Sequence, residues 1–120
     1  MKFTTVGKDN RSVFIEHEEL VITDVQSAMD LMATVYYEKD CDKIILDKSL
    51  ITEDFFQLKT KVAGEILQKF VNYHVKLAII GDFTVYNSKA LQDFIYECNE
   101  GSNIFFVDTL ETAIYKMDSK

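Results

Sequence analysis

Three short apolar segments, separated by longer amphipathic ones, constrain the fold of this chain more than any other feature. Residues 43–47 (KIILD), 75–80 (VKLAII) and 103–107 (NIFFV) are nearly continuous apolar runs of strand length. Because they do not alternate with polar residues, they predict strands that are buried on both faces. Strands that alternate with helices predict a mainly parallel sheet joined by right-handed crossovers.

The first part of the chain adds a hairpin and two helices to this pattern. Residues 2–7 and 12–17 are β-type runs around the polar turn 8–10, which predicts an antiparallel hairpin at or near an edge of the sheet. Asp24 is predicted to cap a helix that runs to about residue 38. Thr52 is predicted to begin the longest helix, which ends near Tyr73.

Two further helices complete the predicted order ββαβαβαβα, an α/β fold. Asn87 or Ser88 is expected to cap the third helix, and Gly101 stands where a glycine commonly ends a helix. Asp108 is expected to cap the last helix, whose apolar residues recur at spacings of three, four and seven. Residues 1–120 are interpreted as a single domain.

Composition excludes several classes of protein. Apolar residues make up 48% of the chain, which rules out disorder, and the net charge of −7 argues against nucleic acid as a partner. No apolar run approaches the ~20 residues of a membrane span, and no secretory leader is apparent. Cys41 and Cys98 form no CxxC motif, so we expect a reduced protein of the cytoplasm.

Candidate ligand-binding residues lie after the predicted strands, where parallel sheets usually bind ligands. Asp47, Asp82 and Asp108 stand at the ends of the three buried strands, and the segment after Asp82 leads to Ser88. Three carboxylates are able to hold Mg²⁺, but each also has a turn or cap role available, so we expect no metal site. The chain has no GxSxG, no GxGxxG and no phosphate loop, and we expect no cofactor.

Lys59 falls in the middle of the apolar arc of the predicted helix 52–73. A lysine at such a position either extends its ammonium group to solvent or pairs with an acidic group. Asp82 is the expected partner, in which case Lys59 anchors a ligand or a partner protein. Convergence of Lys59, Asp82 and Asn72 around one pocket is the arrangement that would reveal a binding site.

Gly64 and Tyr96 are candidate interface residues. A mid-helix glycine costs about 1 kcal/mol relative to alanine, so another backbone is expected to approach Gly64 closely. That backbone belongs to the sheet, to a neighbouring helix or to a second subunit. Tyr96 stands on the polar side of its helix, as interface tyrosines often do. We therefore expect a homodimer or another protein partner.

Several long segments resemble a bacterial family known only as a domain of unknown function, DUF4180. The resemblance covers about residues 20–115, and the segments that carry it are DFFQLKT (54–60), AGEILQKFVNY (63–73), KLAIIGDF (76–83), SKAL (88–91) and DFIYECN (93–99). The family implies no established activity.

The element order is also similar to that of STAS-like domains, the anti-anti-sigma regulators. Their strand–loop–helix junction resembles residues 44–47 followed by 49–54. Those regulators carry a phosphorylatable serine after an aspartate at the start of the helix, whereas here Asp54 is followed by Phe55 and Phe56. The resemblance therefore implies the topology but not the phosphorylation switch.

Two hypotheses of function follow. The first is a non-enzymatic binding or regulatory module that acts through protein contacts or a small ligand at the carboxyl ends of the strands. The alternative is a small hydrolase or transferase that uses the strand-end carboxylates and Lys59. Because the sequence offers no recognisable pair of nucleophile and base, we favour the binding module.

Overall fold

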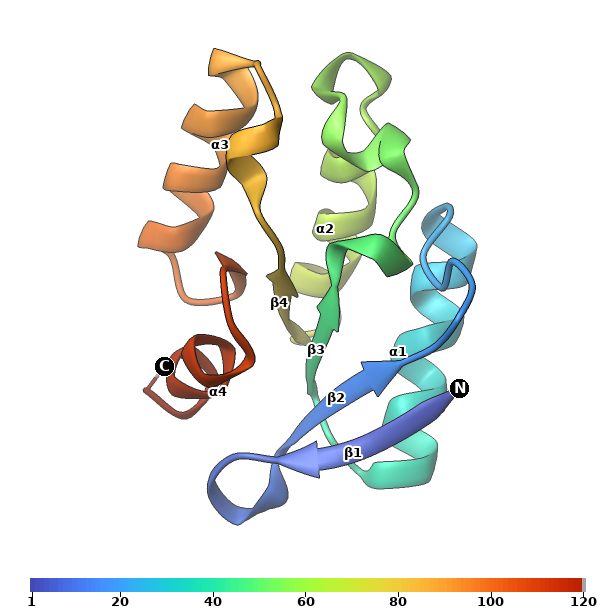
Figure 1. Ribbon diagram of the computed structural model, residues 1–120. Coiled ribbons are helices and arrows are strands. Elements are labelled where there is room, and N and C mark those ends of the chain that lie inside the picture. Colours follow the sequence, from blue (N-terminus) through green and yellow to red (C-terminus); the bar gives the residue numbers. More distant parts are fainter. Residues whose placement is uncertain (120) are drawn as a thin grey trace.

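A computed structural model describes residues 1–119 as a five-stranded mixed sheet with four α-helices (Figure 1), which confirms the predicted α/β fold and element order. The strand order is β1-β2-β3-β4-β5, in which β1 pairs with β2 antiparallel and the other pairs are parallel. The strands are β1 (Lys2–Val6), β2 (Ser12–Glu16), β3 (Lys43–Asp47), β4 (Lys76–Ile80) and β5 (Ile104–Val107).

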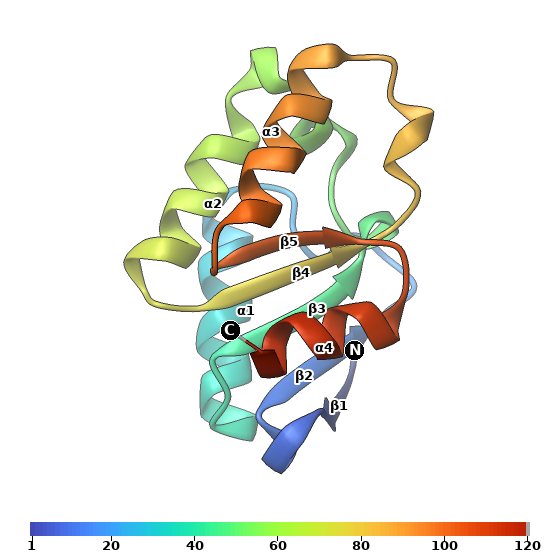
Figure 2. The same ribbon diagram turned by 90° about the vertical axis from the view of Figure 1, so that its left-hand side faces the viewer.

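The helices cover the two faces of the sheet unequally. They are α1 (Val25–Lys39), α2 (Val62–Asn72), α3 (Lys89–Glu100) and α4 (Leu110–Ser119). Each parallel strand is added on the same side of the previous one, so right-handed crossovers keep α1, α2 and α3 on one face. α4 follows the last strand of the sheet and is the one helix of residues 1–119 on the opposite face (Figure 2).

Two separate apolar clusters fill these two faces. The cluster on the three-helix face joins alternate residues of β2 to β5 to α1, α2 and α3, and it includes the fully buried Phe55 and Phe70. The cluster on the one-helix face is much smaller. Its buried members are Ile45, Ala78, Phe105, Val107, Ala113 and Met117.

Polar contacts add to the attachment of α4. The Asp118 carboxylate accepts hydrogen bonds from the backbone N–H of Lys8 at 3.1 Å, in the turn between β1 and β2. Lys43 Nζ donates to the carbonyl of Met117 at 3.1 Å. Gly7 adopts φ = 80°, and a Cβ there would lie 2.9 Å from Asp118 Oδ1. The left-handed backbone and this close approach together explain the glycine.

Two of the predicted caps are confirmed and one is wrong. The Asp24 side chain accepts the N–H of Ser27 at the start of α1, and Ser88 Oγ accepts the N–H of Leu91 at the start of α3. α4 begins one residue later than predicted, and the hydroxyl of Thr109 rather than Asp108 accepts the N–H of Thr112.

Gly101 ends α3, as predicted. Gly101 has φ = −86°, outside the left-handed region that usually favours glycine at this position.

The predicted helix 52–73 is also wrong in its first ten residues. Two 3₁₀ turns, Glu53–Phe56 and Leu58–Thr60, precede α2, which begins only at Val62. Thr60 Oγ1 donates to the carbonyl oxygens of Asp54 and Gln57, and Lys61 is left-handed with φ = 65°. These local bonds satisfy the backbone without an α-helix, which is how threonine competes with helix formation.

Candidate functional site

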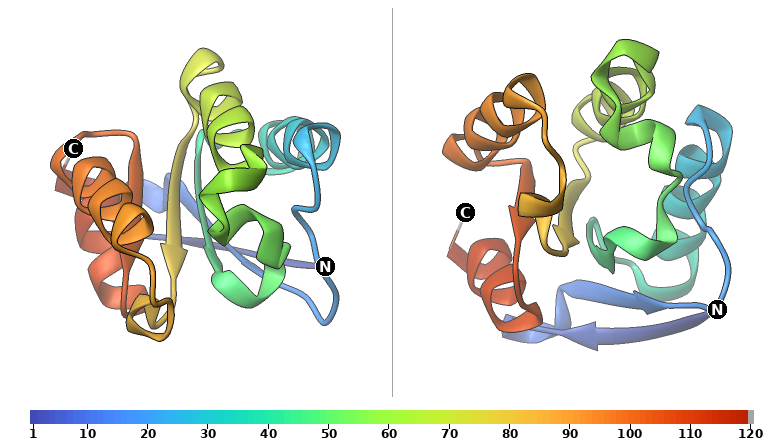
Figure 3. Two further views of the ribbon diagram at one scale, coloured as in Figure 1. Left: turned by 90° about the horizontal axis from the view of Figure 1, so that it is seen from above. Right: turned by 45° about the horizontal axis from the view of Figure 1, so that its top comes forward.

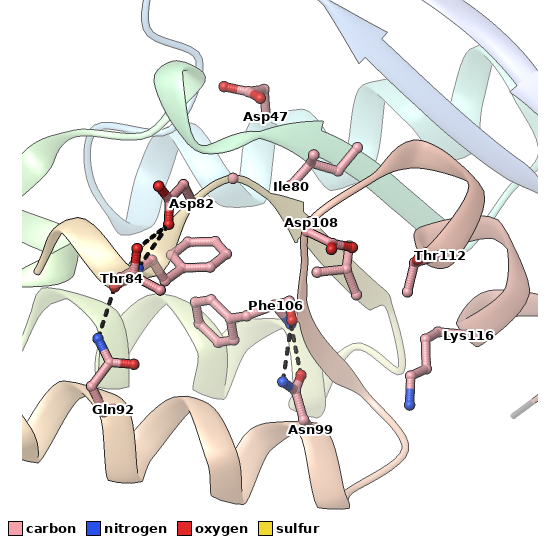
Figure 4. A pocket seen from close by; sticks show the side chains of 13 residues that line it. Asp47, Ile80, Asp82, Thr84, Gln92, Asn99, Phe106, Asp108, Thr112 and Lys116 are labelled. Atoms are coloured by element: carbon pink, nitrogen blue, oxygen red, sulfur yellow. Dashed lines mark hydrogen bonds between the residues drawn. The ribbon is translucent and has the colours of Figure 1, made fainter.

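A groove opens at the carboxyl ends of β3, β4 and β5, with a volume of about 670 Å³ (Figure 4). We call it the strand-end groove. The aspartates at the ends of the three strands line it, and α3 and α4 contribute its walls from opposite faces of the sheet. Its polar lining residues are Asp47, Asp82, Asp108, Thr84, Gln92, Asn99, Thr112 and Lys116, and Ile80, Phe83, Phe106 and Val107 supply apolar surface.

Two of the three aspartates are engaged in local turns, as the sequence predicted. Asp47 accepts the N–H of Ser49 at 2.9 Å. Asp82 accepts both the N–H and the hydroxyl of Thr84, and these bonds, the hydroxyl first, lower the pKa of Asp82. Asp108 is exposed and accepts no hydrogen bond within residues 1–119. Its carboxylate is therefore the one that faces the groove without a local role.

Two amide side chains form the α3 wall of the groove and are held by backbone groups. Asn99 accepts the N–H of Phe106 at 2.8 Å and donates to the carbonyl of the same residue at 3.1 Å. Gln92 Nε2 donates to the carbonyl of Phe83 at 2.7 Å. Asn99 thereby occupies backbone groups on the outer edge of β5, which would otherwise be open to pairing with another strand.

The lysines near the groove are packed against aromatic rings. Lys116 Nζ lies 5.9 Å from the centre of the Phe105 ring. Lys48 Nζ lies 5.0 Å from the centre of the Tyr86 ring and donates to the Tyr86 hydroxyl at 3.3 Å. The stem of Lys48 crosses Gly81, where an added Cβ would lie 2.5 Å from Lys48 Cδ. Gly81 therefore leaves room for Lys48 to reach Tyr86.

Tyr86 joins the segments that follow β3 and β4, a role that the sequence analysis missed. Its ring stacks on Phe56 at 5.1 Å between ring centres, and its hydroxyl donates to the Glu53 carboxylate at 3.3 Å. Burial raises the pKa of Tyr86. The one sequence signal for this role is the position of Tyr86, four residues after Asp82 at the end of a strand.

Lys59, Ser88 and Asn72 do not line the strand-end groove. Lys59 is exposed on the second 3₁₀ turn, because the helix that placed it in an apolar arc does not form there, and it makes no ion pair within residues 1–119. It lines a separate groove together with Ser88, whose hydroxyl caps α3. Asn72 bonds to Gln68 near the end of α2, which leads into the amino end of β4. The structure therefore does not bring Lys59, Asp82 and Asn72 together.

The two candidate interface residues are exposed on different helices. Apart from the backbone of its own helix, a Cβ added to Gly64 in α2 would meet no atom of residues 1–119 within 4 Å, so neither the sheet nor a neighbouring helix in this range explains this glycine. Tyr96 on α3 is 67% exposed and lies one helical turn beyond Gln92, which faces the strand-end groove. Association through Gly64 or Tyr96 stays a prediction.

Within residues 1–119 the structure shows neither a cluster of metal ligands nor a helix that could cross a membrane. No group of three or more histidine, cysteine, aspartate and glutamate side chains in this range is arranged to hold a metal ion. Every helix in the same range is too short or too polar to span a lipid bilayer.

The family model described as "Domain of unknown function (DUF4180)" matches residues 8–117, and the chain therefore belongs to this family. The match confirms the family to which residues 54–99 point. No curated protein and no solved structure matches the chain significantly.

Proposed function

We propose that this member of the DUF4180 family is a binding or regulatory module that takes a small ligand in the strand-end groove. The observation that carries the proposal is the composition of the groove. Asp47, Asp82 and Asp108 come from three successive strands, and the walls come from helices on opposite faces of the sheet. Open parallel sheets bind ligands at this end of their strands.

The chemistry of the lining suggests the kind of ligand. Three carboxylates face the groove, and Asp108 has no hydrogen bond to satisfy it within the described residues. Lys116 lies over an aromatic ring instead of pairing with a carboxylate. A ligand with an amine or another strong donor, attached to an apolar group that packs on Phe83 and Phe106, fits this lining best.

A regulatory role is part of the same proposal. A ligand that contacts both α3 and α4 would strengthen the attachment of α4 to the rest of the chain, and so couple binding to the exposure of the one-helix face. The proposal also includes a STAS-like topology, which the sequential strand order and the antiparallel first strand support. We further propose that the protein is bacterial and cytoplasmic, and its two free cysteines support the second part, a reducing compartment.

The alternative, a hydrolase or transferase, relies on Lys59 acting beside the strand-end carboxylates. Lys59 lines a different groove from Asp47 and Asp82, so no observation favours this alternative.

A fragment screen by amide NMR tests the proposal. We expect aromatic fragments that carry an amine to shift the backbone signals of Asp108, Thr112 and Gln92. Asp108→Asn should weaken these fragments about tenfold by removing the free carboxylate. Asp42→Asn changes an exposed aspartate before β3, at the other end of the strand, and should leave their affinity unchanged. Fragments that shift only signals elsewhere, or that bind equally well to Asp108→Asn, would overturn the proposal.

A further inference from the structure

An apolar groove of about 400 Å³ separates α1 from the end of α2. We call it the α1–α2 groove. Met29, Met32, Ala33 and Tyr36 line it from α1, and Tyr73 and Val75 line it from the segment that joins α2 to β4. None of these side chains is charged, whereas the strand-end groove and the groove beside Lys59 both carry charge. The two helices lie side by side on the three-helix face (Figure 3).

Large aromatic side chains stand exposed around this groove. Tyr36 is 65% exposed and Tyr73 is 57% exposed, and the neighbouring Tyr37 is 89% exposed. Together they expose about as much surface as two whole tyrosine side chains, or roughly 300–500 Å². A partner in a standard protein interface contributes about 800 Å². The tyrosines alone would thus supply about half of one side of a stable interface.

The shape and charge of this surface make it complementary to itself. The tyrosines project, while Met29, Met32 and Ala33 line the depression between the helices. Asp30 is exposed beside Met29 on α1, and Lys69 lies one helical turn before Tyr73 on α2. A two-fold axis that runs along the groove between the two helices brings the α1 rim of one copy against the α2 rim of the other, so each aspartate meets a lysine.

We propose that the α1–α2 groove is the centre of a two-fold contact between two copies of this chain. The tyrosines of each copy fill the depression of the other, and the Asp30 and Lys69 rims pair across the axis. Gly64 is nine residues before Tyr73, which is two and a half helical turns, so it lies on the opposite side of α2 and outside this contact.

Sedimentation of the full chain over micromolar to submillimolar concentrations tests the proposal. We expect a species of twice the 13.9 kDa of one chain. Ala33→Glu places a charge in the depression at an exposed position, and it should raise the dimer Kd at least about tenfold while circular dichroism shows the fold unchanged. Ala90→Glu makes the same change at an exposed alanine of α3 and should leave the Kd unchanged.

A charge swap tests the geometry of the contact. Asp30→Lys places two lysines opposite each other and should weaken the dimer, and adding Lys69→Glu should restore it to within about twofold of the wild-type Kd. A wild-type mass of one chain at every concentration would overturn the proposal. A dimer that Ala33→Glu does not weaken, or one that Gly64→Leu disrupts instead, would also overturn it.

Discussion

Three helices pack on one face of the sheet of this protein, and a single helix packs on the other. The three-helix face holds most of the buried apolar side chains, among them Phe55, Phe70 and the inward residues of four strands. The one-helix face holds a cluster of six buried residues, four from the strands and two from α4. Because local stability follows the number of buried apolar contacts, the two faces should differ in how easily they open.

The strand-end groove lies where these two faces meet. Its α3 wall belongs to the well-packed face, while Thr112 and Lys116 come from α4. A ligand in the groove would therefore touch the helix that rests on the smaller apolar cluster. Binding sites commonly include segments of low local stability. A segment that opens at a small cost in free energy is one that a ligand can hold closed.

The largest expected effects come from truncating the two cores. Phe70→Ala should lower the free energy of unfolding by about 3–5 kcal/mol, since it opens a cavity in the main cluster, and hydrogen exchange should accelerate throughout the chain. Met117→Ala should cost about 2–3 kcal/mol and accelerate exchange in α4 more than in α1. Equal acceleration of α1 and α4 in Met117→Ala would show that the two faces open together.

Replacing two glycines, Gly7 and Gly64, by alanine should give smaller changes in the free energy of unfolding, of opposite sign. Gly7→Ala should destabilise the protein by about 1–2 kcal/mol, because its φ is 80° and the new Cβ would press on Asp118 of α4. Gly64→Ala in α2 should stabilise it by about 0.5–1 kcal/mol, because the helix gains alanine where nothing lies within 4 Å. Urea denaturation measures both. A destabilising Gly64→Ala would reveal a close contact at this position that the isolated chain lacks.

The strands could be predicted from the sequence because a strand that is buried on both faces appears as a short, continuous segment of apolar residues. The apolar segment 43–47 has the bounds of β3, and the segments 75–80 and 103–107 each begin one residue before β4 and β5. The hairpin was equally readable from its polar turn. Which face α4 covers was not predicted, since this depends on the strand order.

The predicted helix 52–73 fails because a helical wheel assumes a constant period. Phe55 and Phe56 are adjacent and both buried, and in the structure a 3₁₀ turn places them so. The helical wheel instead explained both by one broad apolar arc. The position of Lys59 was derived from the same wheel, so its predicted contact with Asp82 lost its basis when the helix did not form there. Side-chain bonds such as those of Thr60 are decided locally and leave no periodic signal.

The strand-end aspartates could be predicted as a group, but the rest of the groove could not. Parallel strands end at one edge of a sheet, so Asp47, Asp82 and Asp108 had to lie along it. Asn99 and Lys116 reach the groove from the far ends of α3 and α4, which only the packing of those helices decides. Tyr86 likewise gains its role from contacts with Lys48 and Glu53, distant in sequence.

The smallest expected contrast concerns the caps of α1 and α4 in acid. Asp24 caps α1 on the three-helix face through a charged side chain, and its hydrogen bonds with Ser27 hold its pKa below the ordinary 3.8. Thr109 caps α4 through a neutral hydroxyl. The contribution of Asp24 is complete above pH 3.8, the unfolded value, and is lost as the pH falls through the lower pKa of the folded state.

Acid should therefore weaken the start of α1 while it leaves the cap of α4 unchanged. In an NMR titration the Ser27 amide should shift with a midpoint below pH 3.8, and the Thr112 amide should show no such step. Asp24→Asn is the matched control, because asparagine caps helices as well as aspartate does but does not titrate. The melting temperature of this variant should fall less steeply with acid than that of the wild type. A Ser27 midpoint at or above pH 3.8 would mean that the hydrogen bond to Ser27 does not stabilise the charged form of Asp24. The stability of the two helix starts would then depend on acid in the same way.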